Sequence, residues 1–140
     1  MSWDSYIDNL RAYSKDSAGG INADRVCIIG LDGAAKWTTD DHPNACRATP
    51  DECSNIAKAF RGKDFTPFQA GGIYLEGIKY QFLREEDNKV VMAKKKDMGS
   101  ITMQASKTAV VIGHCPEGGQ QGSLNKGVTA IADYLENLNM

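Results

Sequence analysis

Long apolar runs are absent from this chain of 140 residues. A membrane-spanning helix needs about 20 consecutive apolar residues, and no stretch approaches that length, so a membrane protein is not expected. The N-terminus also lacks a basic segment followed by an apolar one, and Ser2 rather than glycine follows Met1. Neither a secretory signal nor N-myristoylation is therefore expected, and the sequence predicts a cytoplasmic protein.

The cysteines lack the spacing of a metal site or of a dense disulfide framework. They form no C-x-x-C pair, which favours four reduced thiols at Cys27, Cys46, Cys53 and Cys115. The acidic segment 40–42 lacks the paired ligands of a zinc site and the oxygen-rich pattern of a calcium loop. The glycine-rich segment 118–122 lacks both common phosphate-binding motifs. Neither a metal nor a cofactor is predicted.

An excess of one charge sign is also missing, since the formal net charge is −2. A dedicated nucleic-acid-binding domain is strongly basic, so no nucleic-acid partner is expected. The basic residues are nevertheless unevenly placed. Lys94, Lys95 and Lys96 are consecutive, and Lys79 and Arg84 lie on the preceding predicted strand. This pattern predicts one basic surface, although lysines on an edge strand also serve to block aggregation.

The composition that is present is that of an ordinary globular domain. Hydrophobic residues make up 41% and charged residues 24% of the chain, and no linker, repeat or low-complexity stretch divides it. A chain of this length can bury a core of its own. The prediction is a single domain spanning residues 1–140.

Helical periodicity beside aromatic residues occurs near both ends. At the N-terminal end, Ser2 is a predicted helix cap, and Trp3, Ile7 and Leu10 share one face. A helical wheel places Tyr6 to one side of this apolar stripe.

At the C-terminal end, Ser123 is a predicted cap for a helix whose stripe includes Leu124, Val128 and Ile131. Tyr134 lies roughly 80–100° from the centre of that stripe. Tyr6 and Tyr134 are therefore both expected to flank the core.

The middle of the chain predicts a hairpin and a second helix. Residues 26–29 form a β-branched run, a turn follows at Asp32 and Gly33, and residues 34–38 are predicted to return as a strand carrying Trp37. The next segment, 49–52, combines a capping box with proline at the first helical position, and so predicts a helix that ends near Gly62.

From residue 72 onward, short strand patterns alternate with turn residues. Strands joined by such short connections pair antiparallel. The predicted strands are residues 73–75, 78–84, 89–95, 100–105 and 108–113.

In this order, these elements resemble the profilins along essentially the whole chain. The matching pieces are Trp3-x-x-Tyr6-Ile7-Asp8-x-Leu10, Ile28-Ile29-Gly30-Leu31-Asp32-Gly33 leading to Trp37, Leu75-x-Gly77-x-Lys79-Tyr80, Ala93-Lys94-Lys95 before Gly99, and Ala132-Asp133-Tyr134-Leu135. The resemblance implies an α+β fold with a central antiparallel sheet of about six to seven strands. The terminal helices would pack together on one face, and a short helix would lie on the other.

The resemblance further implies an aromatic groove for proline-rich peptides, formed by Trp3, Tyr6, Trp37 and Tyr134. A polyproline II helix is already extended, so it stacks on flat rings at little cost in ordering. Met140 stands where many relatives have an aromatic residue. From the residues alone, a core position for Trp3 and Trp37 is about as plausible as a ligand-facing one.

The resemblance also implies that monomeric actin is a partner. The matching candidates are Lys79, Arg84, Lys94, Ser123, Asn125 and Lys126. Vertebrate relatives have an aromatic and an acidic residue where this chain has Thr129 and Ala130. Phosphoinositide lipids are a further implied partner, at Lys94, Lys95 and Lys96.

The function predicted from these features is a non-enzymatic, monomeric actin-binding adaptor of the cytoskeleton that also promotes nucleotide exchange on actin. One alternative is a phosphoinositide-responsive module with weak actin activity. A second is a thiol enzyme centred on His114 and Cys115. The second is disfavoured because neighbours on a strand point to opposite faces, which separates the imidazole from the thiol.

Overall fold

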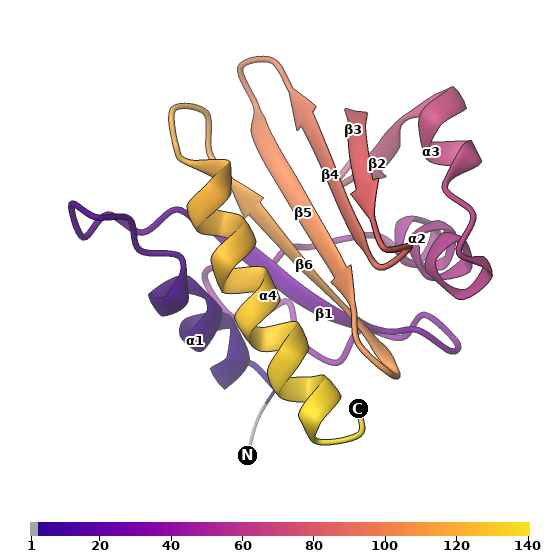
Figure 1. Ribbon diagram of the computed structural model, residues 1–140, viewed down its shortest axis with the longest axis horizontal. Coiled ribbons are helices and arrows are strands. Elements are labelled where there is room, and N and C mark those ends of the chain that lie inside the picture. The colour runs from indigo at the N-terminus through magenta and orange to yellow at the C-terminus, as the bar shows by residue number, and fades with distance from the viewer. Residues whose placement is uncertain (1–2) are drawn as a thin grey trace.

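Six antiparallel strands form one sheet in a computed structural model of the protein, which describes residues 3–140 (Figure 1). The strand order is β1-β6-β5-β4-β3-β2. The strands are β1 (Arg25–Gly30), β2 (Ile73–Leu75), β3 (Ile78–Glu86), β4 (Val90–Lys95), β5 (Gly99–Ala105) and β6 (Ala109–Cys115). The predicted meander is confirmed, and β1 joins it beside β6.

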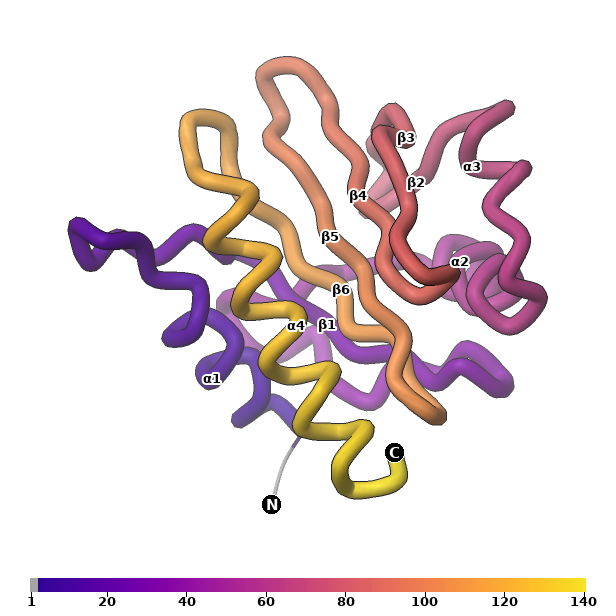
Figure 2. The backbone as a smooth tube through the Cα atoms, in the orientation of Figure 1, coloured from indigo at the N-terminus to yellow at the C-terminus, as the bar shows by residue number. Residues whose placement is uncertain are grey.

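Helices α1 (Ser5–Tyr13) and α4 (Gln121–Asn137) lie next to each other on one face of the sheet (Figures 1 and 2). Their apolar stripes meet strand residues that point the same way, including Val26, Ile28 and Val111, in one buried cluster. Ile7, Leu10, Leu124, Val128 and Leu135 contribute to this cluster and are fully buried. The predicted packing of the two terminal helices on one face is confirmed.

The two terminal helices cross closely at Gly127. A Cβ atom at this position would lie 2.8 Å from the carbonyl oxygen of Leu10 and 3.3 Å from the Cβ of Ser14. Contacts below 3.0 Å force neighbouring atoms to shift, and here the nearest atom belongs to the backbone. The absence of a side chain at Gly127 therefore allows α1 and α4 to approach each other.

The opposite face of the sheet is covered by α2 (Pro50–Gly62) and by a second short helix, α3 (Thr66–Gly71). The sequence analysis did not predict α3. Phe65 and Phe68 anchor it, with Phe65 in ring contact with Phe60 of α2 at 5.1 Å between ring centroids. Pro67 near its start fits the first turn of a helix, where an amide hydrogen is not needed.

The start of α2 is linked to the β2–β3 turn by one buried carboxylate. The side chain of Thr49 accepts from the amide of Glu52, and Glu52 accepts from the amide of Thr49, which confirms the predicted capping box. Glu52 also accepts from the amides of Glu76 and Gly77, at 2.7 and 2.8 Å. Amides that are partly removed from water need acceptors, so this side chain stabilises both the helix start and the turn.

The predicted return strand at residues 34–38 is wrong. This segment forms a single isolated bridge with β1, between Lys36 and Ile29. The amide of Trp37 donates to the carbonyl of Ile28, but the amide of Ile28 is satisfied by the hydroxyl oxygen of Thr38. The hydroxyl of Thr38 thus takes the place of the backbone carbonyl that would accept in a strand pair, and the chain turns away from β1 after one bridge.

The predicted caps of the terminal helices differ from the observed ones. Ser2 lies outside the described residues, and the N-cap position of α1 is Asp4. The helix α4 begins two residues before Ser123, and the amide of its cap residue Gln120 donates to the side-chain oxygen of Asn22 at 2.8 Å. A side chain about 100 residues away in sequence, which local cap rules cannot identify, supports this helix start.

Within residues 3–140, no helix has the length and apolar character needed to cross a membrane. The four cysteines are free and buried in the structure.

Candidate functional site

Four aromatic rings form a continuous row over α1, α4 and the segment after β1. Trp37 contacts Trp3 at 4.7 Å between ring centroids, Trp3 contacts Tyr6 at 5.1 Å, and Tyr6 contacts Tyr134 at 6.1 Å. These separations are typical of interacting aromatic pairs. The structure therefore brings together all four residues predicted to bind proline-rich peptides, which we call the aromatic row.

The rings of the aromatic row differ in exposure. Trp3 and Trp37 are half-buried, and Tyr134 is 49% exposed. Tyr6 is only 8% exposed and belongs to the α1–α4 core, so it lies more deeply than a residue flanking the core. Burial, followed by the neighbouring Tyr134, raises the pKa of the Tyr6 hydroxyl. The tyrosine hydroxyls and the indole N–H groups give this apolar surface hydrogen-bond donors for a ligand.

Met140 is half-buried and packs against the same apolar cluster as Trp3 and Trp37. The hydroxyls of Ser106 and Thr108 donate to its carbonyl oxygen, at 2.8 and 2.7 Å. Met140 thus adds a flexible thioether beside the aromatic rings at this end of the apolar cluster.

Two carboxylates of the α1 region contact the segment that carries Trp37. Asp4 accepts from the amide and the hydroxyl of Thr39, at 2.8 and 2.5 Å. Asp8 lies 2.9 Å from Nε2 of His42. These contacts join residues 34 or more positions apart in sequence, and the sequence analysis did not predict them.

The Asp4 contact predicts a specific acid titration. Hydrogen bonds from the side chain and then from the amide of Thr39 lower the pKa of Asp4 below its ordinary value of 3.8. Because the folded pKa lies below the unfolded one, this contact contributes stability above pH 3.8, and that contribution is lost as the pH falls through the lowered pKa. A carboxyl ¹³C NMR titration should give a midpoint below 3.8 for Asp4, and Thr39→Val should raise it. A midpoint at or above 3.8 in the unsubstituted protein would contradict the assignment.

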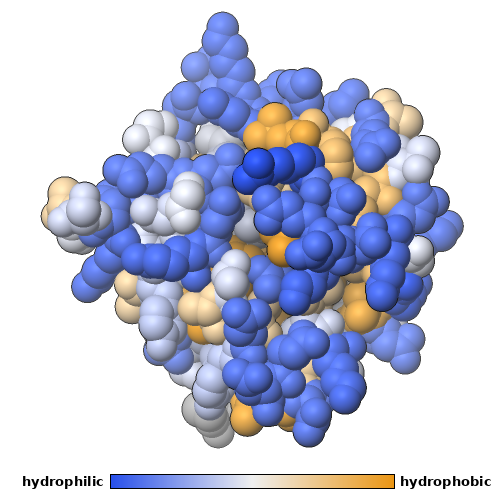
Figure 3. All heavy atoms as spheres, viewed as in Figure 1, coloured by the Kyte–Doolittle hydropathy of each residue, from blue (hydrophilic) through white to orange (hydrophobic). Residues whose placement is uncertain are grey.

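The cationic candidates lie on a second surface, where the sheet extends beyond α4. The amide nitrogen of Asn125 contacts the sulfur of Met92 at 3.5 Å, which shows that Met92 points toward α4. Directly paired residues share a face, and Arg84 is paired with Met92. Alternation along the strands then places Lys94 and Lys79 on this face as well. Figure 3 shows the same face, on which hydrophilic residues predominate.

Lys79, Arg84, Lys94 and Asn125 define this second surface, which we call the cationic face. Ser123 lies in the first turn of α4 and is half-buried, with its hydroxyl 3.4 Å from the side-chain oxygen of Gln120. Lys126 is exposed on the same helix, but its ammonium group lies 3.4 Å from the carbonyl of Lys15, on the α1 side. The structure therefore places Lys79, Arg84, Lys94 and Asn125 on one surface, whereas Lys126 points toward the α1 side.

The consecutive lysines border a hollow of about 460 Å³ between α3 and the ends of β3 and β4. All three lysines are exposed and none has an ion pair within the described residues. The basic side chains lining the hollow are Lys79, Lys94, Lys95 and Lys96. Four ammonium groups around one concave surface favour an anionic ligand.

The sequence model of one protein family, described as Profilin, matches residues 1–140. The chain belongs to the profilin family. It is 65% identical over 140 residues to the profilin of Clypeaster japonicus, with 100% of each chain covered.

Solved profilin structures share the fold. Profilin IA of Acanthamoeba castellanii has a TM-score of 0.78 at 27% identity, covering 99% of this chain and 100% of that one. Mouse profilin IIa, solved in complex with a double repeat from the FH1 domain of mDia1, has a TM-score of 0.71 at 23% identity and full coverage of both chains. LokiProfilin2, solved in complex with rabbit actin, has a TM-score of 0.70 at 20% identity and covers 99% of each chain.

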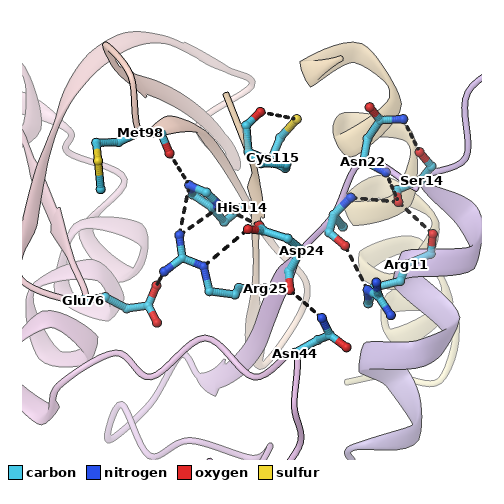
Figure 4. A network of polar contacts seen from close by, with 12 residues as sticks. Arg11, Ser14, Asn22, Asp24, Arg25, Asn44, Glu76, Met98, His114 and Cys115 are labelled. Atoms are coloured by element: carbon cyan, nitrogen blue, oxygen red, sulfur yellow. Dashed lines mark hydrogen bonds and ion pairs between the residues drawn. The ribbon is translucent and has the colours of Figure 1, made fainter. Parts of the chain in front are cut away.

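A buried histidine supports the lysine-bearing turn of this profilin chain (Figure 4). His114 is 2% exposed, and its ring nitrogens face Asp24 at 2.5 Å and the carbonyl of Met98 at 2.7 Å. Arg25 lies beside the ring at 3.1 and 3.2 Å and pairs with Glu76. Met98 and Lys96 both belong to the β4–β5 turn. The network therefore fixes this turn beside the start of β1.

His114 and Cys115 point to opposite faces of the profilin sheet, as predicted. The His114 ring contacts Tyr80 on the α2 side, at 6.0 Å between centroids, whereas Cys115 belongs to the α1–α4 core cluster. Burial raises the pKa of the Cys115 thiol, which disfavours the nucleophilic thiolate. Within residues 3–140, no group of three or more histidine, cysteine or acidic side chains is placed to hold a metal ion.

Proposed function

We propose that the protein is a monomeric, non-enzymatic adaptor that binds monomeric actin and proline-rich segments at two separate surfaces in the cytoplasm and cytoskeleton. The observation that carries this proposal is the aromatic row, which joins Trp37, Trp3, Tyr6 and Tyr134 over two helices and a loop. Membership of the profilin family and the profilin complexes with an FH1 repeat and with actin support it.

The aromatic row suits a proline-rich ligand for a physical reason. A polyproline II helix has no internal hydrogen bonds, so its carbonyl groups are free to accept from Tyr and Trp donors. Its rings are apolar and pre-ordered, and they match the flat aromatic rings of the row. The occupants we propose are the proline-rich segments of actin nucleators and elongators.

The cationic face is the proposed actin site. An acidic partner surface would be attracted to Lys79, Arg84 and Lys94 mainly through a faster encounter and a fixed orientation. Asn125 adds a neutral group whose side chain is already held by hydrogen bonds to β4 and β5. Bound here, the protein would promote nucleotide exchange by favouring a more open form of actin.

The two proposed sites are compatible with simultaneous binding. Asn125 and Tyr134 lie nine residues apart on α4, which corresponds to roughly 14 Å along a helix. They also face different neighbours, since Asn125 contacts the sheet and Tyr134 contacts α1. A ternary complex would raise the local concentration of actin at a proline-rich partner.

Reversal of one charge on the cationic face should weaken actin binding. We expect Lys94→Glu to raise the dissociation constant for monomeric actin roughly tenfold and to make it less salt-dependent. The matched control is Lys58→Glu, since Lys58 is also exposed and lies on α2, which covers the opposite face. Equal weakening by both variants would indicate a general charge effect, and an unchanged affinity in Lys94→Glu would remove this face as the actin site.

A second candidate function rests on the lysine-lined hollow. Its four ammonium groups favour phosphoinositide headgroups, and this would make the protein a lipid-responsive module with weak actin activity. Sedimentation with vesicles of phosphatidylcholine plus phosphatidylinositol bisphosphate, compared with an actin-binding assay, separates the two functions. Strong vesicle binding by a protein that fails to bind actin would favour the second.

A further inference from the structure

We propose that Asp4 and Asp8 are positioning residues of the aromatic row. Their contacts with Thr39 and His42 hold the segment after β1 against α1 and thereby keep Trp37 on Trp3. The consequence for ligand affinity rests on the proposed binding of proline-rich peptides, whereas the consequence for ring geometry holds without any ligand.

The side chain of Asp4 contacts a segment that is distant in sequence. Aspartate at an N-cap position commonly accepts from an amide of the first helical turn, and loss of that bond costs about 1 kcal/mol of stability. Asp4 is the N-cap residue of α1, yet its side chain makes no cap hydrogen bond. It accepts from both the amide and the hydroxyl of Thr39 instead. Asp4 has helical φ and ψ angles, whereas a capping residue normally has extended ones, so its carboxylate serves the long-range contact with Thr39 and does not cap α1.

The contact between Asp8 and His42 forms one turn further along α1. The amide of Asn44 donates to Nδ1 of His42 at 2.9 Å, so Nδ1 carries no proton and Nε2 is the nitrogen that donates to Asp8. The His42 side chain is only 13% exposed. Its two bonds fix the ring between α1 and its own loop.

These contacts matter because β1 holds the loop at its two ends and not at residues 39–42. Before residues 39–42, the chain has a bridge to β1 at Lys36, and its hydrogen bonds with Ile28 end at Thr38. After them, the next bridge to β1 is at Ala45. Among the described residues, the hydrogen bonds and ion pairs that residues 39–42 make outside their own loop go to Asp4 and Asp8. Trp37 lies two residues before Thr39. Its position therefore depends both on the bonds of its own segment to β1 and on the contacts of residues 39–42 with Asp4 and Asp8.

The test measures ring geometry and affinity together. The chain has two tryptophans, both in the aromatic row, so the exciton-coupled circular dichroism of the Trp pair reports their contact directly. We expect Thr39→Val, which removes one donor at nearly constant shape, to reduce this signal and to weaken decaproline binding about tenfold. Thr39→Ser restores the hydroxyl and should restore both. The matched control is Asp40→Asn, because Asp40 pairs with Lys36 inside the same loop.

Each outcome decides the proposal. A reduced Trp signal in Thr39→Val with recovery in Thr39→Ser supports it, while equal effects in Asp40→Asn overturn it. An unchanged Trp signal in Thr39→Val also overturns it, whatever happens to affinity. If the unsubstituted protein fails to bind decaproline, the proposed function is wrong, and the Trp signal alone still decides whether Thr39 positions the pair.

Discussion

Replacement of Trp3 by alanine is expected to abolish decaproline binding and to leave actin binding unchanged. Trp3 is central to the aromatic row, since its ring contacts both Trp37 and Tyr6. Its loss removes a large apolar surface and separates the ring of Trp37 from those of Tyr6 and Tyr134. Central aromatic residues of an interface commonly contribute 2 kcal/mol or more, which corresponds to a loss of about 30-fold or greater. Calorimetric titration with the peptide and an actin-monomer assay measure the two effects.

The control for this experiment is Tyr13→Ala. Tyr13 is 54% exposed, is the last residue of α1 and has no ring contact in the aromatic row. The Tyr13→Ala variant should bind decaproline with the affinity of the unsubstituted protein. Saturable peptide binding by Trp3→Ala would show that the ring is part of the core and not of a ligand surface. A loss of actin binding in Trp3→Ala would show instead that the substitution disturbs the whole fold.

Replacement of Gly127 by alanine is expected to lower the free energy of unfolding by about 1–3 kcal/mol, the usual cost of overpacking. The added methyl group would lie 2.8 Å from the carbonyl oxygen of Leu10, so α1 must move away from α4. Because α1 carries Tyr6 and α4 carries Tyr134, proline binding should weaken as well. Chemical denaturation and peptide titration measure the two effects.

Gly122 supplies the matched control on the same helix. A Cβ at this position meets no heavy atom within 4 Å. Alanine is a better helix former than glycine by about 0.8–1 kcal/mol, so Gly122→Ala should keep or slightly raise stability. The two glycines would be equivalent, and the close approach at Gly127 unimportant, if both variants had the same stability.

The parts of the fold that were predictable from sequence are those specified by neighbouring residues. The capping box of Thr49 and Glu52 predicted the start of α2, because both partners lie within one turn. The turns of the meander include positive φ angles at Asp87, Asn88 and Gly99, which are residue types that favour such turns. The order of strands β2 to β6 followed from the short connections between them.

The parts that were not predictable depend on contacts between distant segments. The expected strand at residues 34–38 has a suitable local pattern, but Thr38 and Thr39 bind Ile28 and Asp4 through side chains. The start of α4 is supported by Asn22, far from it in sequence. Gly127 stands in an otherwise regular helical pattern, so nothing near it predicts that it meets α1.

The candidate site was predictable to a similar extent. Helical spacing and family resemblance identified Trp3, Tyr6, Trp37 and Tyr134, which the fold then assembles. The carboxylates that hold the loop of Trp37 were missed, since an acidic residue near the start of a helix is ordinarily explained by capping or by the helix dipole.

The carboxylate of Glu52 has a consequence for how the protein opens. It accepts from amides of the α2 start and of the β2–β3 turn at once. Fraying of the helix start would leave the amides of Glu76 and Gly77 without their acceptor, and opening of the turn would leave the buried Glu52 carboxylate with fewer donors. We therefore expect the two segments to form one cooperative unit, whose amides exchange their hydrogens with solvent together.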